Sequence, residues 1–329
     1  MSQLMISLDK KILDFNSSVA QRMIDYGKEN ELFIIIPDVK KNVLDLSPTV
    51  HVWSTGGNKL QQFCRLKKIG KKIIQDSRFK IQDSLITTQD PFFIGWVGWY
   101  LKKKFGIKLE VQLHGDFFSS YYKKHWFRLC LAKFIIKRAD VVRVVGERVK
   151  NSIVNLGIKE NKIIVRPVAV DVERIKNYQP KIELHQKYPG YDKIFLVLGR
   201  LEPVKNIEWL IDVFKVVVEK KNKYLLLIVG SGQEEQNLKL KIVNNKLQNN
   251  IKFETWTNDP ISYLKTTDCV LFPSLSEGYG LVPTEANLMN TRIIMSDVGV
   301  ANYELKPGDK VQILPINNKT IWLKAILSV

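Results

Sequence analysis

The sequence predicts an α/β protein made of two doubly wound domains, each with a parallel sheet between layers of helices. Short apolar runs alternate along the chain with segments of helical length, and this alternation is typical of parallel sheets. It stops over residues 172–192, which are polar and carry Pro180, Pro189 and Gly190, and then restarts. A chain of 329 residues is long enough for two such domains.

The first expected domain covers residues 1–171. Its apolar runs predict strands, and Gly27 and Gly157 follow two of its predicted helices, where glycine commonly caps a helix. The expected strands are Met5–Leu8, Glu31–Ile36, Val50–Ser54, Ser84–Thr88, Lys108–Leu113, Val141–Val145 and Lys162–Val165. The expected helices are Asn16–Tyr26, Lys59–Gln75, Pro91–Lys104, Ser120–Arg138 and Arg148–Leu156.

Residues 172–192 are interpreted as a linker, and residues 193–329 as the second domain. Its expected strands are Ile194–Leu198, Tyr224–Val229, Ile251–Glu254, Cys269–Phe272 and Arg292–Met295. Its expected helices are Ile207–Lys220, Glu234–Asn244, Pro260–Lys265, Pro283–Asn290 and one from Thr320. Two α/β domains joined by a hinge are expected to bind a ligand in the cleft that they face, at the carboxyl ends of strands.

Residues 273–299 form the most informative stretch, because they read as loop, helix and strand directly after the apolar run Cys269–Phe272. Glycines break the loop, and Pro283 suits the first turn of a helix, where its missing N–H needs no partner. Free N–H groups at a helix start attract anions. Glu277 and Glu285 flank that start, so the stretch predicts a ligand that is part phosphate and part polyol.

Two further loops follow strands of the second domain. Gly199 permits a sharp turn after the first strand, and Arg200 and Lys205 then offer two cations that suit a diphosphate. Gly230-Ser231-Gly232 follows the next strand but lacks the third glycine of a dinucleotide-binding motif. Because Glu234 and Glu235 open the helix after it and would repel phosphate, we interpret it as a tight turn near the ligand.

The charge of the chain is its one unusual compositional feature. A hydrophobic content of 45% is typical of globular proteins, whereas the formal net charge is +18. Such a charge suits nucleic acid, an anionic membrane surface or phosphorylated substrates, or it reflects solvated lysines alone. Nucleic acid is not expected as a partner, because no binding motif accompanies the charge.

Localisation is expected to be cytoplasmic, with peripheral contact to the inner face of the plasma membrane. The sequence shows no signal-peptide pattern and no apolar run of membrane-spanning length. Cys64, Cys130 and Cys269 lie in apolar contexts and are expected to be buried free thiols. A basic stripe of Arg65, Lys68 and Lys72, with the aromatic and basic segments 96–104 and 121–137, favours a membrane-facing surface.

These motifs together resemble glycosyltransferase family 4. The resemblance covers the whole second domain and rests on Gly199-Arg200 with Lys205, Gly230-Ser231-Gly232, Pro273-Ser274, Glu277-Gly278-Tyr279-Gly280 and Glu285-Ala286. Over the first domain it is looser and rests on His114-Gly115-Asp116, Ala139-Asp140 and residues 167–171. It implies a retaining, hexosyltransferase-type enzyme (EC 2.4) with a nucleotide-sugar donor and the GT-B fold of two Rossmann-like domains.

The resemblance also implies roles for single residues. Glu277 would face the donor sugar's hydroxyls, and Glu285 would accept hydrogen bonds from the ribose. Backbone N–H groups near Gly280, Leu281 and Val282 would meet the diphosphate. Arg200 and Lys205 would stabilise the leaving nucleoside diphosphate. In the first domain His114 would help to hold the sugar.

The acceptor implied by this reading is a glycan or a lipid-linked sugar of envelope polysaccharide synthesis. Base recognition is expected around Thr255–Asn258. The nucleotide-sugar is a substrate, and no further cofactor is expected. Asp-x-Asp, the motif that holds a metal in glycosyltransferases of the GT-A fold, does not occur in the sequence, so metal-independent chemistry is favoured.

Two departures from the family pattern stand out. The expected glycine-rich loop after the first strand is replaced by residues 8–14, where Lys10 or Lys11 would have to supply the charge. The segment after Glu304 is short, so a C-terminal brace on the first domain is expected to be reduced. The alternatives left open are a GT-B-fold epimerase or phosphorylase, and a non-catalytic basic protein that binds glycan or nucleic acid.

Overall fold

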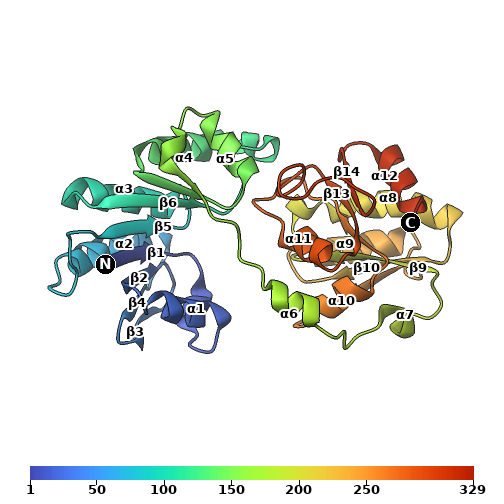
Figure 1. Ribbon diagram of the computed structural model, residues 1–329, viewed down its shortest axis with the longest axis horizontal. Helices are drawn as coiled ribbons and strands as arrows, with labels where there is room; N and C mark the ends of the chain where they lie inside the picture. Colours follow the sequence, from blue (N-terminus) through green and yellow to red (C-terminus); the bar gives the residue numbers. More distant parts are fainter. The chain divides into compact units, whose positions relative to one another are not determined.

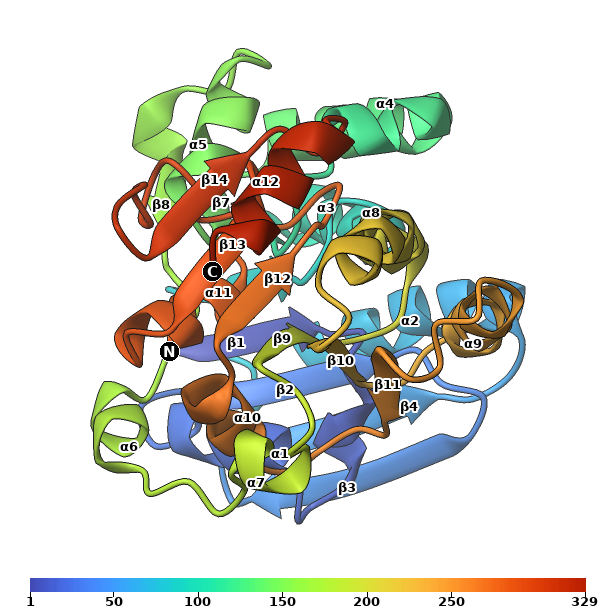
Figure 2. The same ribbon diagram turned by 90° about the vertical axis from the view of Figure 1, so that its right-hand side faces the viewer.

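The computed structural model describes residues 1–329, with the exception of the side chain of Lys124. The chain forms two compact units. The first contains Met1–Val145 and Lys150–Arg166, and the second contains Gly146–Val149 and Pro167–Val329. Figures 1 and 2 show a sheet with helices on both sides in each unit. The predicted class, two α/β units with parallel sheets, is confirmed.

The first unit has an eight-stranded sheet in the order β3-β4-β2-β1-β5-β6-β7-β8. All neighbouring strands are parallel except β3 and β4, which form an antiparallel edge. The strands are β1 (Ser2–Ile6), β2 (Glu31–Ile36), β3 (Lys41–Ser47), β4 (Val50–Thr55), β5 (Leu85–Thr88), β6 (Lys108–Leu113), β7 (Val141–Val144) and β8 (Ile163–Val165).

The helices of the first unit are η1 (Lys10–Leu13), α1 (Ser18–Tyr26), α2 (Lys59–Ile74), α3 (Phe93–Phe105), η2 (Ser120–His125), α4 (Trp126–Arg138) and η3 (Glu160–Lys162). Helix α5 (Glu147–Val154) is divided, because its first residues group with the second unit and the rest with the first. Local signals start and stop several of them. Asn58 and Gln61 form a capping box at the start of α2, and Gly106 ends α3 in the left-handed conformation. On one sheet face, Met23 of α1 packs in a core with Val50 and Val52 of β4.

The second unit has a six-stranded parallel sheet in the order β11-β10-β9-β12-β13-β14. The strands are β9 (Lys193–Leu198), β10 (Tyr224–Val229), β11 (Ile251–Glu254), β12 (Cys269–Phe272), β13 (Arg292–Ser296) and β14 (Val311–Leu314). Numbered within the unit, this order is 3-2-1-4-5-6, the arrangement of the Rossmann fold. Its direction reverses between β9 and β12, and such a switch point is where open α/β sheets bind ligands.

Two apolar cores hold helices against the two faces of this sheet. On one face lie α8 (Ile207–Lys220), α9 (Glu235–Asn244) and α12 (Lys319–Leu327), with Trp322 fully buried. On the other lie α7 (Leu184–Lys187), α10 (Pro260–Thr266) and α11 (Leu281–Leu288). The unit also contains α6 (Val172–Asn177) and η4 (Pro203–Lys205).

Several local expectations differ from the structure. Residues 41–47 and 311–314 are edge strands that were not predicted, because short and partly polar edge strands carry a weak periodic signal. The helix expected over 120–138 is divided into η2 and α4. Residues 172–192, expected as a linker, include α6 and α7 and lie in the second unit. Cys64 and Cys130 are exposed, so only Cys269 is the buried thiol that was expected.

Candidate active site

The candidate site lies at the switch point of the second unit's sheet. Residues 199–205 follow β9 and residues 273–280 follow β12, and these two strands are neighbours. The N–H of Leu275 donates to the carbonyl oxygen of Val204 at 2.8 Å, which ties the two loops together. The glycine-bearing loops picked out in the sequence therefore meet at one edge of the sheet.

Lys205 and Glu277 form an ion pair across these loops. Lys205 Nζ lies 2.6 Å from Glu277 Oε1, and the two side chains are only 20% and 15% exposed. The ammonium also lies 5.2 Å from the centre of the Phe272 ring. Two predicted site residues, 72 positions apart in the chain, are thus in direct contact and partly shielded from water.

Helix α11 begins directly after the loop that carries Glu277. Gly280 has a φ of 110°, and the helix starts at Leu281, two residues earlier than expected. The N–H groups of Leu281 and Val282 lie in the first turn, where a helix cannot satisfy them itself, and Pro283 has none to satisfy. These features make the helix start a suitable contact for an anion.

Glu285 is half-buried on α11, one turn further along. Burial raises the pKa of its carboxyl group above the ordinary value, and the positive charge of Arg174 on α6 partly opposes that rise. Glu285 and Glu277 have different partners, so the structure does not arrange them as a coupled acid–base pair.

Arg200 does not join the Lys205–Glu277 pair. Its side chain is 73% exposed and its Nη1 lies 2.6 Å from Glu202 Oε1 within the same loop. The prediction that Arg200 and Lys205 act together on a diphosphate stays a prediction; in the structure Lys205 bonds to Glu277 after β12, whereas Arg200 pairs with Glu202.

Ser274 is a polar residue that was not singled out as a site residue by the sequence. It is 1% exposed, and within the described part of the chain its Oγ has no hydrogen-bond partner. A small space of about 10 Å³ lies between Ser274, Gly199 and Lys205. The sequence signals for it are its place directly after a buried strand and its membership of the Pro273-Ser274 motif, to which no role was assigned.

Gly299 packs directly against the backbone of the loop that carries Glu277 and Tyr279. A Cβ atom at this position would lie 2.0 Å from the carbonyl oxygen of Tyr279, and its φ is 57°. The next residue, Val300, donates its N–H to that same oxygen at 2.7 Å. Arg148, which groups with the second unit, holds the Gly299 segment by donating to the carbonyl oxygens of Gly299 at 3.0 Å and Ala301 at 2.8 Å.

The turn Gly230-Ser231-Gly232 packs against the Gly199 loop, as its interpretation as a tight turn requires. A Cβ on Gly230 would lie 1.9 Å from the carbonyl oxygen of Gly199, and one on Gly232 would lie 2.4 Å from that of Leu201. Helix α9 then begins with Glu235. Backbone contact between the two turns explains both glycines.

His114 lies in the first unit, directly after β6. Its Nε2 is 3.1 Å from Oε1 of Gln112, and the residue is exposed. Desolvation by the protein packed around the imidazole lowers its pKa, and the neighbouring Arg143 charge lowers it further. A lowered pKa favours the neutral ring, which accepts or donates a hydrogen bond as its tautomer allows.

Lys10, the substitute cation expected in the first unit, lies at the start of η1. Its Nζ is 2.6 Å from Oδ1 of Asp38, although the lysine side chain stays 60% exposed. Residues 8–14 thus present a lysine that is already engaged by a carboxylate.

The described residues contain no group of three or more His, Cys, Asp or Glu side chains that could hold a metal ion. In the same part of the chain, no helix is long and apolar enough to cross a membrane.

Comparison with protein families matches both halves of the chain. Residues 180–329 match the model of the group 1 glycosyl transferases, and residues 47–174 match that of glycosyltransferase family 4.

Among similar proteins, the O-antigen chain mannosyltransferase RfbU of Salmonella typhimurium is 29% identical, over 64% of this chain and 56% of its own length. A UDP-Gal:alpha-D-GlcNAc-diphosphoundecaprenol alpha-1,3-galactosyltransferase of Escherichia coli is 26% identical, over 66% of this chain and 58% of its own. The chain spans about half the length of the curated relatives that it matches.

Solved structures share the fold of the whole chain. Anabaena HepE in complex with UDP and glucose superposes with a TM-score of 0.76 at 17% identity, covering 100% of this chain and 89% of that one. Sucrose-phosphate synthase from Thermosynechococcus elongatus gives a TM-score of 0.79 at 18% identity, with the same coverage. Together with the two parallel-sheet units, these similarities establish the GT-B fold.

Proposed function

The chain belongs to glycosyltransferase family 4, and from that premise we propose that it is a retaining glycosyltransferase that uses a nucleotide-sugar donor. The acceptor that we propose is a glycan or a lipid-linked sugar in polysaccharide synthesis. The relatives named as an O-antigen chain mannosyltransferase and a GlcNAc-diphosphoundecaprenol galactosyltransferase support that acceptor class.

The observation that carries the proposal is the Lys205–Glu277 pair at the switch point. Shielding an ammonium and a carboxylate from water costs desolvation free energy, so such a pair is often retained because it binds a ligand. A sugar diphosphate uses both, because its phosphate oxygens attract the ammonium and its hydroxyl groups donate to the carboxylate. The pair then holds the two parts of the donor on either side of the bond that breaks.

The other donor contacts that we propose surround this pair. The N–H groups of Leu281 and Val282 bind the diphosphate, with Gly278, Tyr279 and Gly280 forming the loop that leads to them. Gly199 gives the phosphates access to the Arg200 loop, and Arg200 leaves Glu202 to contact them. Glu285 accepts a hydrogen bond from the ribose. In the first unit, we propose His114 as a contact for the sugar.

In the proposed reaction the bond between the anomeric carbon and the phosphate oxygen breaks, and a bond from that carbon to an acceptor oxygen forms on the same face. The acceptor's proton passes to the departing phosphate. Lys205, Arg200 and the helix start stabilise the negative charge that develops on the nucleoside diphosphate. Glu277 and His114 hold the sugar in position.

A panel of nucleotide-sugars tests the donor proposal. Thermal unfolding is measured with each candidate, because a bound donor stabilises the folded protein by mass action. The protecting donor is then assayed for transfer to acceptors, and the anomeric configuration of the product is determined by NMR. We expect protection by one donor class, transfer with retention, and loss of transfer in Glu277→Gln.

Three outcomes of this panel would contradict the proposal. Inversion at the anomeric carbon would exclude the retaining mechanism. Release of free nucleoside diphosphate with a rearranged sugar and no acceptor would favour an epimerase. Binding of glycan with no protection by any nucleotide-sugar would favour a non-catalytic protein.

We also propose a peripheral contact with an anionic membrane through the start of α4. Trp126 and Phe127 are 70% and 69% exposed there, and two exposed basic residues flank them, Lys123 on η2 and Arg128 on α4. Exposed aromatic side chains beside basic ones are typical of interfacial helices. Co-sedimentation with phosphatidylglycerol vesicles tests this contact, and Trp126→Ser/Phe127→Ser should abolish it. Equal sedimentation of both proteins would contradict it.

A further inference from the structure

The first unit contains a groove that the proposed donor site does not use. It lies between α2 and the strands β2, β4 and β3 at one edge of the sheet, and its volume is about 450 Å³. Volumes of this size are ordinary for pockets that bind small organic ligands. Because every lining residue belongs to Met1–Val145, the groove is complete within one compact unit.

The groove is lined by five cations and one carboxylate. The cations are Lys41, Arg65, Lys68, Lys72 and Arg78, and the carboxylate is Asp76. Three of the cations lie on α2 at steps of three and four residues, so they share one side of the helix along about 10 Å of its length.

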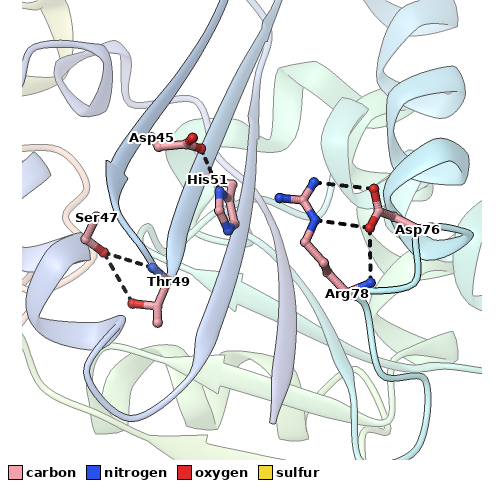
Figure 3. Close-up of polar contacts among 6 residues, drawn as sticks. All are labelled: Asp45, Ser47, Thr49, His51, Asp76 and Arg78. Atoms are coloured by element: carbon pink, nitrogen blue, oxygen red, sulfur yellow. Dashed lines mark hydrogen bonds and ion pairs between the residues drawn. The ribbon is translucent and has the colours of Figure 1, made fainter.

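Two acidic side chains near the groove, Asp76 and Asp45, are already engaged by partners of their own. Asp76 receives two hydrogen bonds from the Arg78 guanidinium, at 3.1 and 3.3 Å. Asp45 accepts from His51, whose Nδ1 lies 2.6 Å from its Oδ1. Figure 3 shows these two pairs on the β-strands and on the segment after α2.

The lysines of the groove, in contrast, make no close ion pair among the residues that the structure describes, and only Lys72 acts on Asp76 through its charge. Lys41, Lys68 and Lys72 are exposed and make no ion pair within 4.0 Å in that part of the chain. The groove therefore keeps an excess of positive charge that the protein itself does not neutralise. Charge of this kind favours an anionic ligand.

An aromatic side chain forms part of the groove wall. Trp53 is half-buried and lies nearly parallel to the Phe33 ring, with ring centres 6.1 Å apart and an angle of 11° between planes. Phe33 is fully buried and packs in turn on Phe79. A recessed, fixed indole offers a flat apolar surface next to the cations, which suits the apolar face of a sugar ring.

We propose that this groove binds a segment of an anionic glycan. The cations along α2 hold its phosphate or carboxylate groups, and a sugar ring packs on Trp53. The site anchors a charged glycan on the first unit, whereas the donor loops belong to the second. This inference rests on the proposed function and deepens it, because it assigns a negatively charged polymer as acceptor or product.

A bilayer fits this groove less well than a glycan does. Membrane-binding aromatics must protrude into the interface, whereas Phe33 is buried and Trp53 is recessed. The protruding aromatics of this unit, Trp126 and Phe127, lie on α4 and do not line the groove. Anionic vesicles are therefore the competing ligand in the test.

The test uses hyaluronan hexasaccharide as the anionic probe and maltohexaose as the neutral one, with affinities measured by calorimetry at low salt. The variant is Lys68→Gln/Lys72→Gln. Its matched control is Lys133→Gln/Lys137→Gln, which removes two exposed lysines at the same spacing from α4 of the same unit. Protection by UDP in thermal unfolding is measured for all proteins, since the donor site is in the other unit.

We expect hyaluronan to bind the unmodified protein, to bind the α2 variant about tenfold more weakly, and to bind the α4 control normally. Maltohexaose should bind more weakly than hyaluronan to the unmodified protein, and UDP protection should be equal throughout. Equal hyaluronan affinity for both variants would overturn the groove proposal. So would binding of phosphatidylglycerol vesicles that depends on Lys68 and Lys72 without any hyaluronan binding. If UDP did not protect the unmodified protein against thermal unfolding, that result would instead contradict the proposed donor chemistry.

Discussion

Lys205 Nζ and Glu277 Oε1 lie 2.6 Å apart, and each residue comes from a loop at the carboxyl end of one of two adjacent strands. Both side chains are mostly shielded from water, so each charge depends on the other for compensation. A donor that carries phosphate and hydroxyl groups can replace this mutual contact with one contact for each residue. The pair thus marks the point where the proposed diphosphate and sugar meet.

Replacing Lys205 should remove part of the charge stabilisation in the transition state. In Lys205→Met we expect kcat/KM for transfer to fall by a factor of about 10² to 10³, as when one group that stabilises transition-state charge is removed. Steady-state kinetics with the protecting donor measure this effect. Arg200→Gln provides the comparison and should cause a smaller loss, because Arg200 is exposed and paired with Glu202. Unchanged kcat/KM in Lys205→Met would exclude the proposed role.

The same lysine offers a stability test. Lys205→Met leaves the Glu277 carboxylate shielded and without its ion-pair partner, which destabilises the fold. Adding Glu277→Gln to that variant should restore part of the lost free energy of unfolding, whereas it should restore no transfer activity. Urea denaturation at pH 7 measures the first effect, and an additive loss of stability would argue against the coupling.

Glu285 should show opposite effects on stability and on donor binding. Burial raises the pKa of its carboxyl group, so ionising it costs more in the folded chain than in the unfolded chain. The resulting penalty is absent below the ordinary glutamate pKa and grows as the pH rises through the folded-state value. Glu285→Gln should therefore stabilise the protein relative to the original at pH 7 but much less at pH 4.

Denaturation curves at the two pH values, together with calorimetric titration of UDP, check this prediction. The amide is a poorer acceptor for the ribose hydroxyls, so UDP affinity should fall while stability rises. A variant that is less stable at pH 7 would mean that Arg174 outweighs the burial. Unchanged UDP affinity would remove Glu285 from the proposed ribose contact.

A methyl group at Gly299 should displace the loop that carries Tyr279. Its left-handed φ and the 2.0 Å approach of the Tyr279 carbonyl oxygen leave no room for a Cβ atom. We expect Gly299→Ala to lose about 1–3 kcal/mol of stability and to weaken UDP binding. Gly308→Ala is the matched control, since nothing lies within 4 Å of a Cβ there. Equal melting temperatures for the two variants would contradict the packing argument.

The sequence predicts buried strands better than edge strands, and the reason is physical. Long apolar runs such as Tyr224–Val229 are buried over their whole length, so their strand signal does not depend on tertiary context. Edge strand β3 has no such run, because alternate residues such as Val43 face solvent. Its position is set by antiparallel pairing with β4, which the local sequence pattern does not indicate.

The site was predicted in the same uneven way. Lys205, Glu277 and the start of α11 could be predicted because strand ends, glycines and charges are local features. Gly299 and Ser274 could not, because the close approach to Tyr279 and the buried hydroxyl exist only once separate loops have packed. The exposure of Arg200 is likewise a result of its pairing with Glu202.

Trp256 should contribute to recognition of the nucleotide base. It lies in the segment 255–258 where base contacts were expected, two residues after β11, and is 57% exposed. The neighbouring turn after β10 is fixed to this strand end, because Gly230 donates its N–H to the carbonyl oxygen of Glu254 at 3.1 Å. An exposed indole at the carboxyl edge of the sheet is well placed to stack on a base, and such stacking is worth about 1–3 kcal/mol.

Trp256→Ala should weaken UDP binding by a factor of about 5 to 150, measured by calorimetry. Trp126→Ala removes an even more exposed tryptophan from the first unit and should leave UDP affinity unchanged. The same loss in both variants, or in neither, would place the base elsewhere on the second unit.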